Sequence, residues 1–152
     1  MDALFHWLEH SRVSMAVASS TTLTGSLSAV HVIGFVLVMS GALVANLRAL
    51  GVLLAKHNLA DVKRQANGVV IVGLTLSLVT GALLFSARAS DASANPIFQL
   101  KMGLVLAAVL VHFGVARGLR DAGVVLAGIG HAVSLFVWLA LAVVACAFIL
   151  LE

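Results

Sequence analysis

Four long, mostly apolar stretches divide the chain, and short polar segments separate them. At a helical rise of about 1.5 Å per residue, each stretch is long enough to cross a hydrocarbon core of about 30 Å. The pattern predicts an all-α integral membrane protein, a four-helix transmembrane bundle in a single domain, 1-152. The predicted spans are residues 23–47, 67–87, 97–117 and 124–150.

The segment before the first span, residues 2–18, predicts an amphipathic helix in the membrane interface. It is too short and too charged to span, and it lacks the basic start of a secretion signal. Trp7 and Phe5 are residue types that anchor such helices at the membrane surface. Its apolar side holds Leu4, Phe5 and Leu8, and its polar side holds Asp2, His6 and Glu9.

The composition agrees with a membrane protein and excludes two other classes. Hydrophobic residues make up 62% of the chain and charged residues 10%, whereas soluble domains are about a quarter charged. No basic run is interleaved with aromatic residues, which excludes nucleic-acid binding. The single cysteine, Cys146, excludes a disulfide framework and a CxxC metal site.

The distribution of Lys and Arg predicts the orientation. The first and third connections between spans must lie on the same side of the membrane. By the positive-inside rule, the side richer in Lys and Arg is the cytoplasmic one. That side holds Arg48, Lys56, Lys63, Arg64, Arg117 and Arg120, and the other holds Arg12, Arg88 and Lys101. We therefore expect both termini outside, in the periplasm if the protein belongs to a bacterial inner membrane.

Small residues recur every three or four positions on each span and predict where the helices touch, because small side chains let backbones approach closely in lipid. On these faces lie the only histidines of the spans, His31, His112 and His131. An ionisable side chain inside a membrane is costly unless it meets protein, water or a cofactor. Hydrogen bonding to a neighbouring hydroxyl or carbonyl group and ligation of a cofactor are both open for each histidine.

His112 and His131 are equidistant from the third turn, so they should lie at similar depth, about 10 Å below the inner surface. Two facing imidazoles can bind haem iron from both sides. Arg48, Arg117 and Arg120 lie at that surface and suit haem propionates. Neighbouring helices pack at about 8–10 Å, so these two would have to splay or lie across the bundle to admit a haem.

A second group lies in the outer half of the predicted bundle. It consists of His31, Thr80 and Lys101, with Asn95 above them. Lys101 either extends to the interface or pairs with an anionic headgroup, a quinone oxygen or a propionate. Because His31 and His112 should lie about 18 Å apart in depth, they cannot share one haem.

His6 and His10 are four residues apart, so both face one side of a helix and form a weak candidate site for copper or zinc. No GxSxG, P-loop or HExxH motif occurs, and no Asp or Glu lies in the middle of a span. These absences favour an electron carrier or binding subunit over an enzyme or a proton-coupled transporter.

Four motifs carry a family resemblance over roughly residues 1–115: His31-x-x-Gly34, Asn46-Leu-Arg48-Ala-Leu-Gly51, Thr80-Gly81-x-x-Leu84-Phe85 and Asn95-Pro96-x-Phe98-x-x-Lys101. They are similar to motifs of small four-span bacterial membrane proteins of uncharacterised function. Those proteins more loosely resemble CopD-like copper-resistance and cytochrome b561-like membrane proteins. The resemblance implies the four-span fold and marks His31, Arg48 and Lys101 as family-like positions.

Three functions follow as hypotheses. The first is a b-type cytochrome-like electron carrier, with haem held by His112 and His131, or by His31 with an unknown partner. The second is a copper-handling protein that uses His6, His10 and His31. The third is a structural or partner-anchoring subunit whose histidines join helices. The expected partners are membrane lipid, a quinone or redox subunit, and a second copy of the chain.

Overall fold

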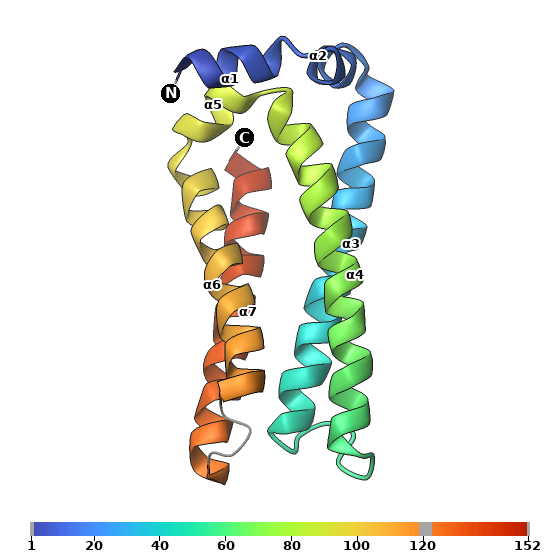
Figure 1. Ribbon diagram of the computed structural model, residues 1–152, viewed down its shortest axis with the longest axis vertical. Helices are drawn as coiled ribbons and strands as arrows, with labels where there is room; N and C mark the ends of the chain where they lie inside the picture. The colour runs from blue at the N-terminus through green and yellow to red at the C-terminus, as the bar shows by residue number, and fades with distance from the viewer. Residues whose placement is uncertain (1, 119–122, 152) are drawn as a thin grey trace.

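The computed structural model describes residues 2–118 and 123–151, which form seven helices without a strand. The four long helices lie side by side, with both termini at one end (Figure 1). We call this the terminal end, and the opposite end the loop end. The helices are α1 (Asp2–Glu9), α2 (Arg12–Ser19), α3 (Thr21–Ala49), α4 (Leu59–Ser86), α5 (Ala89–Ala94), α6 (Pro96–Gly118) and α7 (Val124–Leu151).

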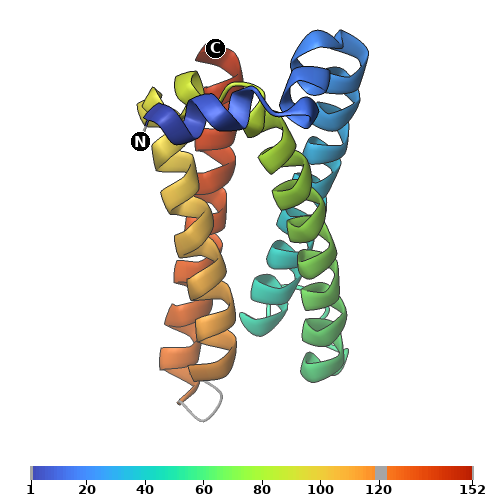
Figure 2. The same cartoon turned by 45° about the horizontal axis from the view of Figure 1, so that its top comes forward.

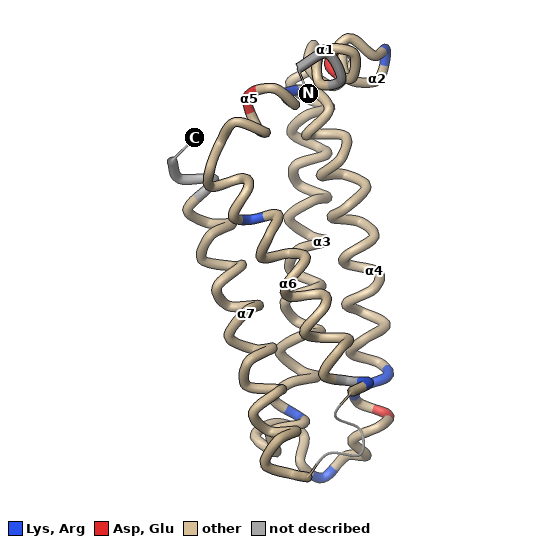
Figure 3. Tube along the Cα trace, turned by 60° about the vertical axis from the view of Figure 1, so that its left-hand side comes forward, with Lys and Arg blue, Asp and Glu red and all other residues tan. Residues whose placement is uncertain are grey.

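The four long helices are apolar and long enough to cross a membrane, which confirms the all-α four-span fold and an integral membrane protein. Figure 3 shows that Lys, Arg, Asp and Glu lie mostly near the two ends of these helices. Three of the helices match the predicted spans closely. The helix α4 begins earlier than its predicted span because Asn58 caps it: Asn58 Oδ1 accepts from the amides of Ala60, at 2.8 Å, and Asp61, at 3.4 Å.

The segment before the first span forms two helices, where one was predicted. Ser11 interrupts it, because its Oγ accepts from the Ser14 amide at 3.2 Å and so caps α2. Ser14 Oγ in turn donates to the Leu8 carbonyl at 2.7 Å and fixes α2 against α1. Figure 2 shows both helices lying across the terminal end. The exposed Trp7 side chain suits the interfacial position that the sequence predicts.

The tightest helix contact joins α3 and α4 and depends on glycine. A Cβ atom at Gly73 would lie 2.6 Å from the Gly34 carbonyl oxygen and 2.7 Å from the Val38 amide nitrogen. A Cβ atom at Gly41 would lie 2.7 Å from the Ala66 carbonyl oxygen. Side chains larger than hydrogen would therefore force the two backbones apart. This confirms the predicted small-residue contact face.

The hairpin of α6 and α7 meets α3 mainly through α7. Figures 1 and 2 show the two hairpins, α3 with α4 and α6 with α7, as the two halves of the bundle. The buried core takes residues from all four long helices, which makes the two halves one packed unit. Its members are Val38, Ala42, Val70, Ala108, Trp138 and Leu141.

The connection from α3 to α4 is held by the end of α3. Gly51, with φ of 75°, adopts the left-handed conformation. The amide of Val52 then bonds to the Leu47 carbonyl at 3.0 Å, and the Gly51 amide bonds to the Arg48 carbonyl at 3.1 Å. The guanidinium group of Arg48 donates to the His57 carbonyl at 2.6 Å. Arg48 thus fastens the loop at the loop end.

Asn95 and Pro96 start α6, as the sequence predicts. Asn95 Oδ1 accepts from the amides of Ile97, at 2.8 Å, and Phe98, at 3.3 Å. An aromatic cluster sits beside this cap. The Phe85 ring stacks on the Phe98 ring at 5.4 Å and meets the Phe5 ring edge-on at 6.2 Å. The cluster ties α1, α4 and α6 together at the terminal end.

Candidate functional site

The terminal half of the bundle contains His31, whose ring packs against α4. His31 Nδ1 lies 2.9 Å from the Ser77 carbonyl oxygen. A carbonyl oxygen only accepts, so Nδ1 carries the proton and Nε2 keeps its lone pair. Gly81 leaves room for the ring, because a Cβ atom there would lie 3.0 Å from His31 Cε1. The backbone of α4 thus fixes both the orientation and the tautomer of His31.

Thr80 and Lys101 accompany His31, as the sequence predicts. Thr80 Oγ1 lies 3.2 Å from His31 Nδ1 and donates its own proton to the Leu76 carbonyl at 2.6 Å. Its lone pairs are therefore free to accept from His31. Lys101 on α6 is within electrostatic reach of His31. We call these residues, with Ser77, the terminal-end site.

The loop half contains a hydrogen-bonded chain through His131. Asn46 Nδ2 donates to the Ala42 carbonyl at 2.8 Å, which leaves Asn46 Oδ1 to accept from His131 Nδ1 at 3.0 Å. His131 Nε2 lies 3.1 Å from Lys63 Nζ, and an ammonium group only donates. Both ring nitrogens of His131 are therefore used in bonds to α3 and α4.

His112 lies in the same half of the bundle and interacts electrostatically with His131. Its Nε2 atom bonds to Asn67 Oδ1 at 3.1 Å, so it donates a proton to α4. The His112 ring meets the Trp138 ring edge-on, with 6.0 Å between the centroids. Together with the chain through His131, these contacts join all four long helices. We call this group the loop-end layer.

Two of the three cations predicted for haem propionates make contacts of their own in the structure. Arg48 holds the loop between α3 and α4, at the far end of α3 from His31. Arg117 lies over the Phe113 ring, with its guanidinium carbon 6.0 Å from the ring centroid. Arg120 lies outside the described residues.

His6 and His10 stack on α1, with their ring centroids 4.1 Å apart. His10 Nδ1 donates to the His6 carbonyl at 2.8 Å, which leaves its Nε2 as the acceptor nitrogen. Within residues 2–118 and 123–151, no group of three or more His, Cys, Asp or Glu side chains is placed to hold a metal ion. The pair is thus a two-ligand arrangement.

Three residues that bond to the loop-end histidines are not among the candidates that the sequence suggests. Lys63 falls in a predicted connection, and Asn67 is the first residue of a predicted span. A signal for both exists: Lys63 and Asn67 are four residues apart and share a helix face once α4 is known to start at Leu59. Asn46 stands out in the sequence only as part of a motif.

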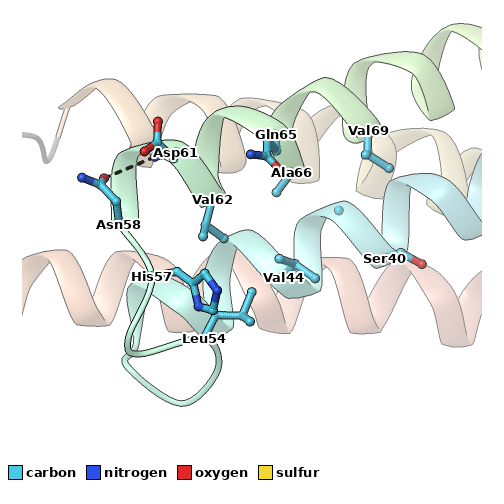
Figure 4. Close-up of a pocket in the computed structure, with 11 residues that line it drawn as sticks. Ser40, Val44, Leu54, His57, Asn58, Asp61, Val62, Gln65, Ala66 and Val69 are labelled. Atoms are coloured by element: carbon cyan, nitrogen blue, oxygen red, sulfur yellow. Dashed lines mark hydrogen bonds between the residues drawn. The ribbon is translucent and has the colours of Figure 1, made fainter.

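A groove of about 480 Å³ lies at the loop end of the bundle, between α3, the loop after it and α4 (Figure 4). Its walls are mostly apolar, and His57, Asn58 and Asp61 lie at its loop end. It is separate from the terminal-end site, since none of that site's residues lines it.

Searches for similar proteins find no matching family model, curated protein or solved structure. The geometry of the terminal-end site and of the loop-end layer is therefore what points to a function.

Proposed function

We propose that this membrane protein is a b-type cytochrome-like electron carrier that binds haem in the terminal half of the bundle, with His31 as an axial ligand. One observation carries the proposal: His31 Nδ1 donates to the Ser77 carbonyl, so Nε2 is the nitrogen that keeps its lone pair. Histidines that bind metal characteristically donate their other ring nitrogen to a carbonyl or carboxylate, which fixes the ring and raises its basicity.

Three neighbours of His31 support the proposal. Thr80 adds a second acceptor for Nδ1, and Gly81 keeps the ring close to α4. Lys101 supplies a positive charge in the same half of the bundle, where it would pair with a propionate. A haem bound there supplies reversible one-electron chemistry. The chain's own part is to hold the imidazole in one tautomer and to balance the charge.

The geometry favours His31 over the pair His112 and His131 as the source of a ligand. Both nitrogens of His131 are bonded to protein, and so is Nε2 of His112. Ligation by the pair would require a bond of His131 to break first, although His112 Nδ1 has no hydrogen-bond partner among the described residues. His31 needs no such rearrangement.

A second candidate function rests on the loop-end layer. Its bonds run from α7 to α3 and α4 and from α6 to α4. Such contacts suit a structural or partner-anchoring subunit, in which histidines hold helices together. Copper bound through His6 and His10 is the remaining alternative, and elemental analysis of the purified protein tests it directly.

We place both termini on the outer face and the loop end on the cytoplasmic face of a bacterial inner membrane. Lys56, Lys63, Arg64 and Arg117 lie towards the loop end, where Figure 3 shows several basic residues. The positive-inside rule supports this orientation. On it, the proposed haem lies in the outer half of the bilayer.

Absorption spectra of the detergent-purified protein, produced with a haem supply, test the proposal. We expect a Soret band that shifts on dithionite reduction, with α and β bands appearing. His31→Ala should abolish the band, because the axial ligand is lost. His57→Ala is the matched control, since His57 is an exposed loop histidine, and its spectrum should equal that of the unaltered protein.

Two results would contradict the assignment. A Soret band that survives His31→Ala but disappears in His112→Ala or His131→Ala would move the haem to the loop-end layer. A protein that binds no haem under any of these conditions would leave the structural and copper functions. Loss of bound copper in His6→Ala or His10→Ala would then distinguish between these two.

A further inference from the structure

Besides Arg48 Nε at the end of α3, three buried polar atoms of α6 and α7 have no hydrogen-bond partner among the residues that the structure describes. They are His112 Nδ1, Ser134 Oγ and Trp138 Nε1. The exposed fractions of these residues are 5%, 1% and 1%. An unpaired polar group inside a bilayer costs free energy, because no bulk water reaches it. Three in one region therefore need an explanation.

The three atoms belong to side chains that lie together. Ser134 and Trp138 are four residues apart and share one face of α7. The Trp138 ring packs edge-on against the His112 ring of α6. The orphaned atoms thus come from adjoining side chains at the contact between α6 and α7.

Their hydrogen-bonding characters are complementary. Trp138 Nε1 only donates, and the Ser134 hydroxyl both donates and accepts. His112 Nε2 donates to Asn67 Oδ1, so His112 Nδ1 is an acceptor. A single hydroxyl group between them would satisfy the indole as an acceptor and the imidazole as a donor. A charged ligand would gain less here, because the three atoms belong to neutral groups.

We propose that His112, Ser134 and Trp138 form an internal binding site for a small neutral ligand that carries a hydroxyl group. Two sources supply that chemistry: a water molecule, or the hydroxyl of a hydroquinone from the membrane. The three protein atoms are enclosed, which favours water. The occupant continues the hydrogen bond from Asn67 through His112 to Trp138. This site is independent of the proposed haem at His31.

Nuclear magnetic resonance tests the site through the Trp138 indole group. Trp7→Phe, at an exposed residue, leaves Trp138 as the single tryptophan, so a ¹⁵N-tryptophan-labelled sample gives one indole N–H signal. Bound water predicts a cross-peak between this signal and water. Addition of a short-chain hydroquinone that shifts the signal saturably and removes the cross-peak would assign the site to that ligand. A signal with no water cross-peak and no response to hydroquinone would overturn the proposal.

Thermal stability gives a second test, which needs no tryptophan signal. If Ser134 bonds to an occupant, Ser134→Ala breaks that bond and lowers Tm. If the hydroxyl is an unpaired group in a dry contact, its removal leaves Tm unchanged or raises it. Ser40→Ala is the matched control, because Ser40 is an exposed helical serine that bonds only to the Val36 carbonyl of its own helix. A Tm change equal to that of the control would overturn the proposal.

Discussion

Two histidines at opposite ends of the bundle are used in different ways. The hydrogen bonds of the His31 ring within the described residues go to α4, and Nδ1 faces the α4 backbone, so the other nitrogen is left as an acceptor. His131 uses both nitrogens, one for α3 and the other for α4. The residue type is the same, but its partners decide whether it can bind something else.

The packing around each histidine explains the difference. Near His31, glycines bring α3 and α4 so close that the ring meets a backbone carbonyl. Near His131, asparagine and lysine side chains fill the space between helices and bond to the ring. Close backbone contact therefore leaves a ligand nitrogen available, whereas a polar side-chain network occupies both. Single substitutions can disrupt the glycine contact near His31 and the side-chain network around His131 separately.

The largest effect is expected at the glycine contact. In Gly73→Ala, the new Cβ would lie 2.6 Å from the Gly34 carbonyl oxygen, a backbone atom that cannot move without shifting α3. Overpacking of this kind costs about 1–3 kcal/mol. We expect a loss of that size in the free energy of unfolding in detergent, measured by denaturant titration. Haem binding should weaken with it, since α4 positions His31.

Gly68→Ala is the control for this variant. Gly68 is on the same helix, but a Cβ there would meet no atom within 4 Å. The substitution should be neutral or slightly stabilising, because alanine favours helix more than glycine does. Equal losses in the two variants would show that helix propensity, and not contact between α3 and α4, sets the effect.

A smaller effect is expected in the loop-end layer. Asn46→Leu keeps much of the side-chain volume but removes the acceptor for His131 Nδ1. Polar contacts between membrane helices contribute about 1 kcal/mol each. We expect a decrease of about that size in unfolding free energy, with the Soret band retained because His31 is untouched.

A double-mutant cycle isolates the bond. In a His131→Phe background, Asn46→Leu should cost little, since its hydrogen-bond partner is already gone. If the cost is the same in both backgrounds, then Asn46 stabilises the bundle through its packing or its bond to Ala42.

The fold was largely predictable from the sequence, because the length of an apolar run is a strong signal. The spacing of Gly34, Gly41 and Gly73 also predicts the tight contact between α3 and α4. The start of α4 was less predictable, since Asp61, Lys63 and Arg64 lower the hydropathy of its first turns. The short helix α5 has no comparable signal, because a residue distant in sequence, Glu9, bonds to its first turn.

The candidate site was predictable in its residue types but not in its bonds. Spacing placed His31 with Thr80, and the structure confirms that contact. It could not show that His31 also meets the Ser77 backbone, because backbone acceptors leave no trace in residue identity. Nor could it assign Lys63 to His131, since that contact depends on how far α4 extends beyond the apolar run.

The smallest effect is expected outside the bundle, where Glu9 accepts from the Ser90 amide at 2.7 Å. This hydrogen bond, helped by the nearby His10 and His6, lowers the pKa of Glu9 below its ordinary value of 4.5. The folded state thus favours the carboxylate. Its stabilisation is present above pH 4.5 and is lost as the pH falls through the lowered pKa.

Glu9→Gln tests this contact through the pH dependence of Tm. The variant should melt slightly below the unaltered protein at neutral pH, and the difference should vanish in acid, where both side chains are neutral. A difference that persists below the lowered pKa would show that the charge of Glu9 is irrelevant. Because Glu9 is partly exposed to water, its hydrogen bond competes with solvent. The hydrogen bond between Asn46 and His131 is buried and has no such competitor. Burial of a hydrogen bond, more than its donor–acceptor distance, should therefore set the order of these effects on stability.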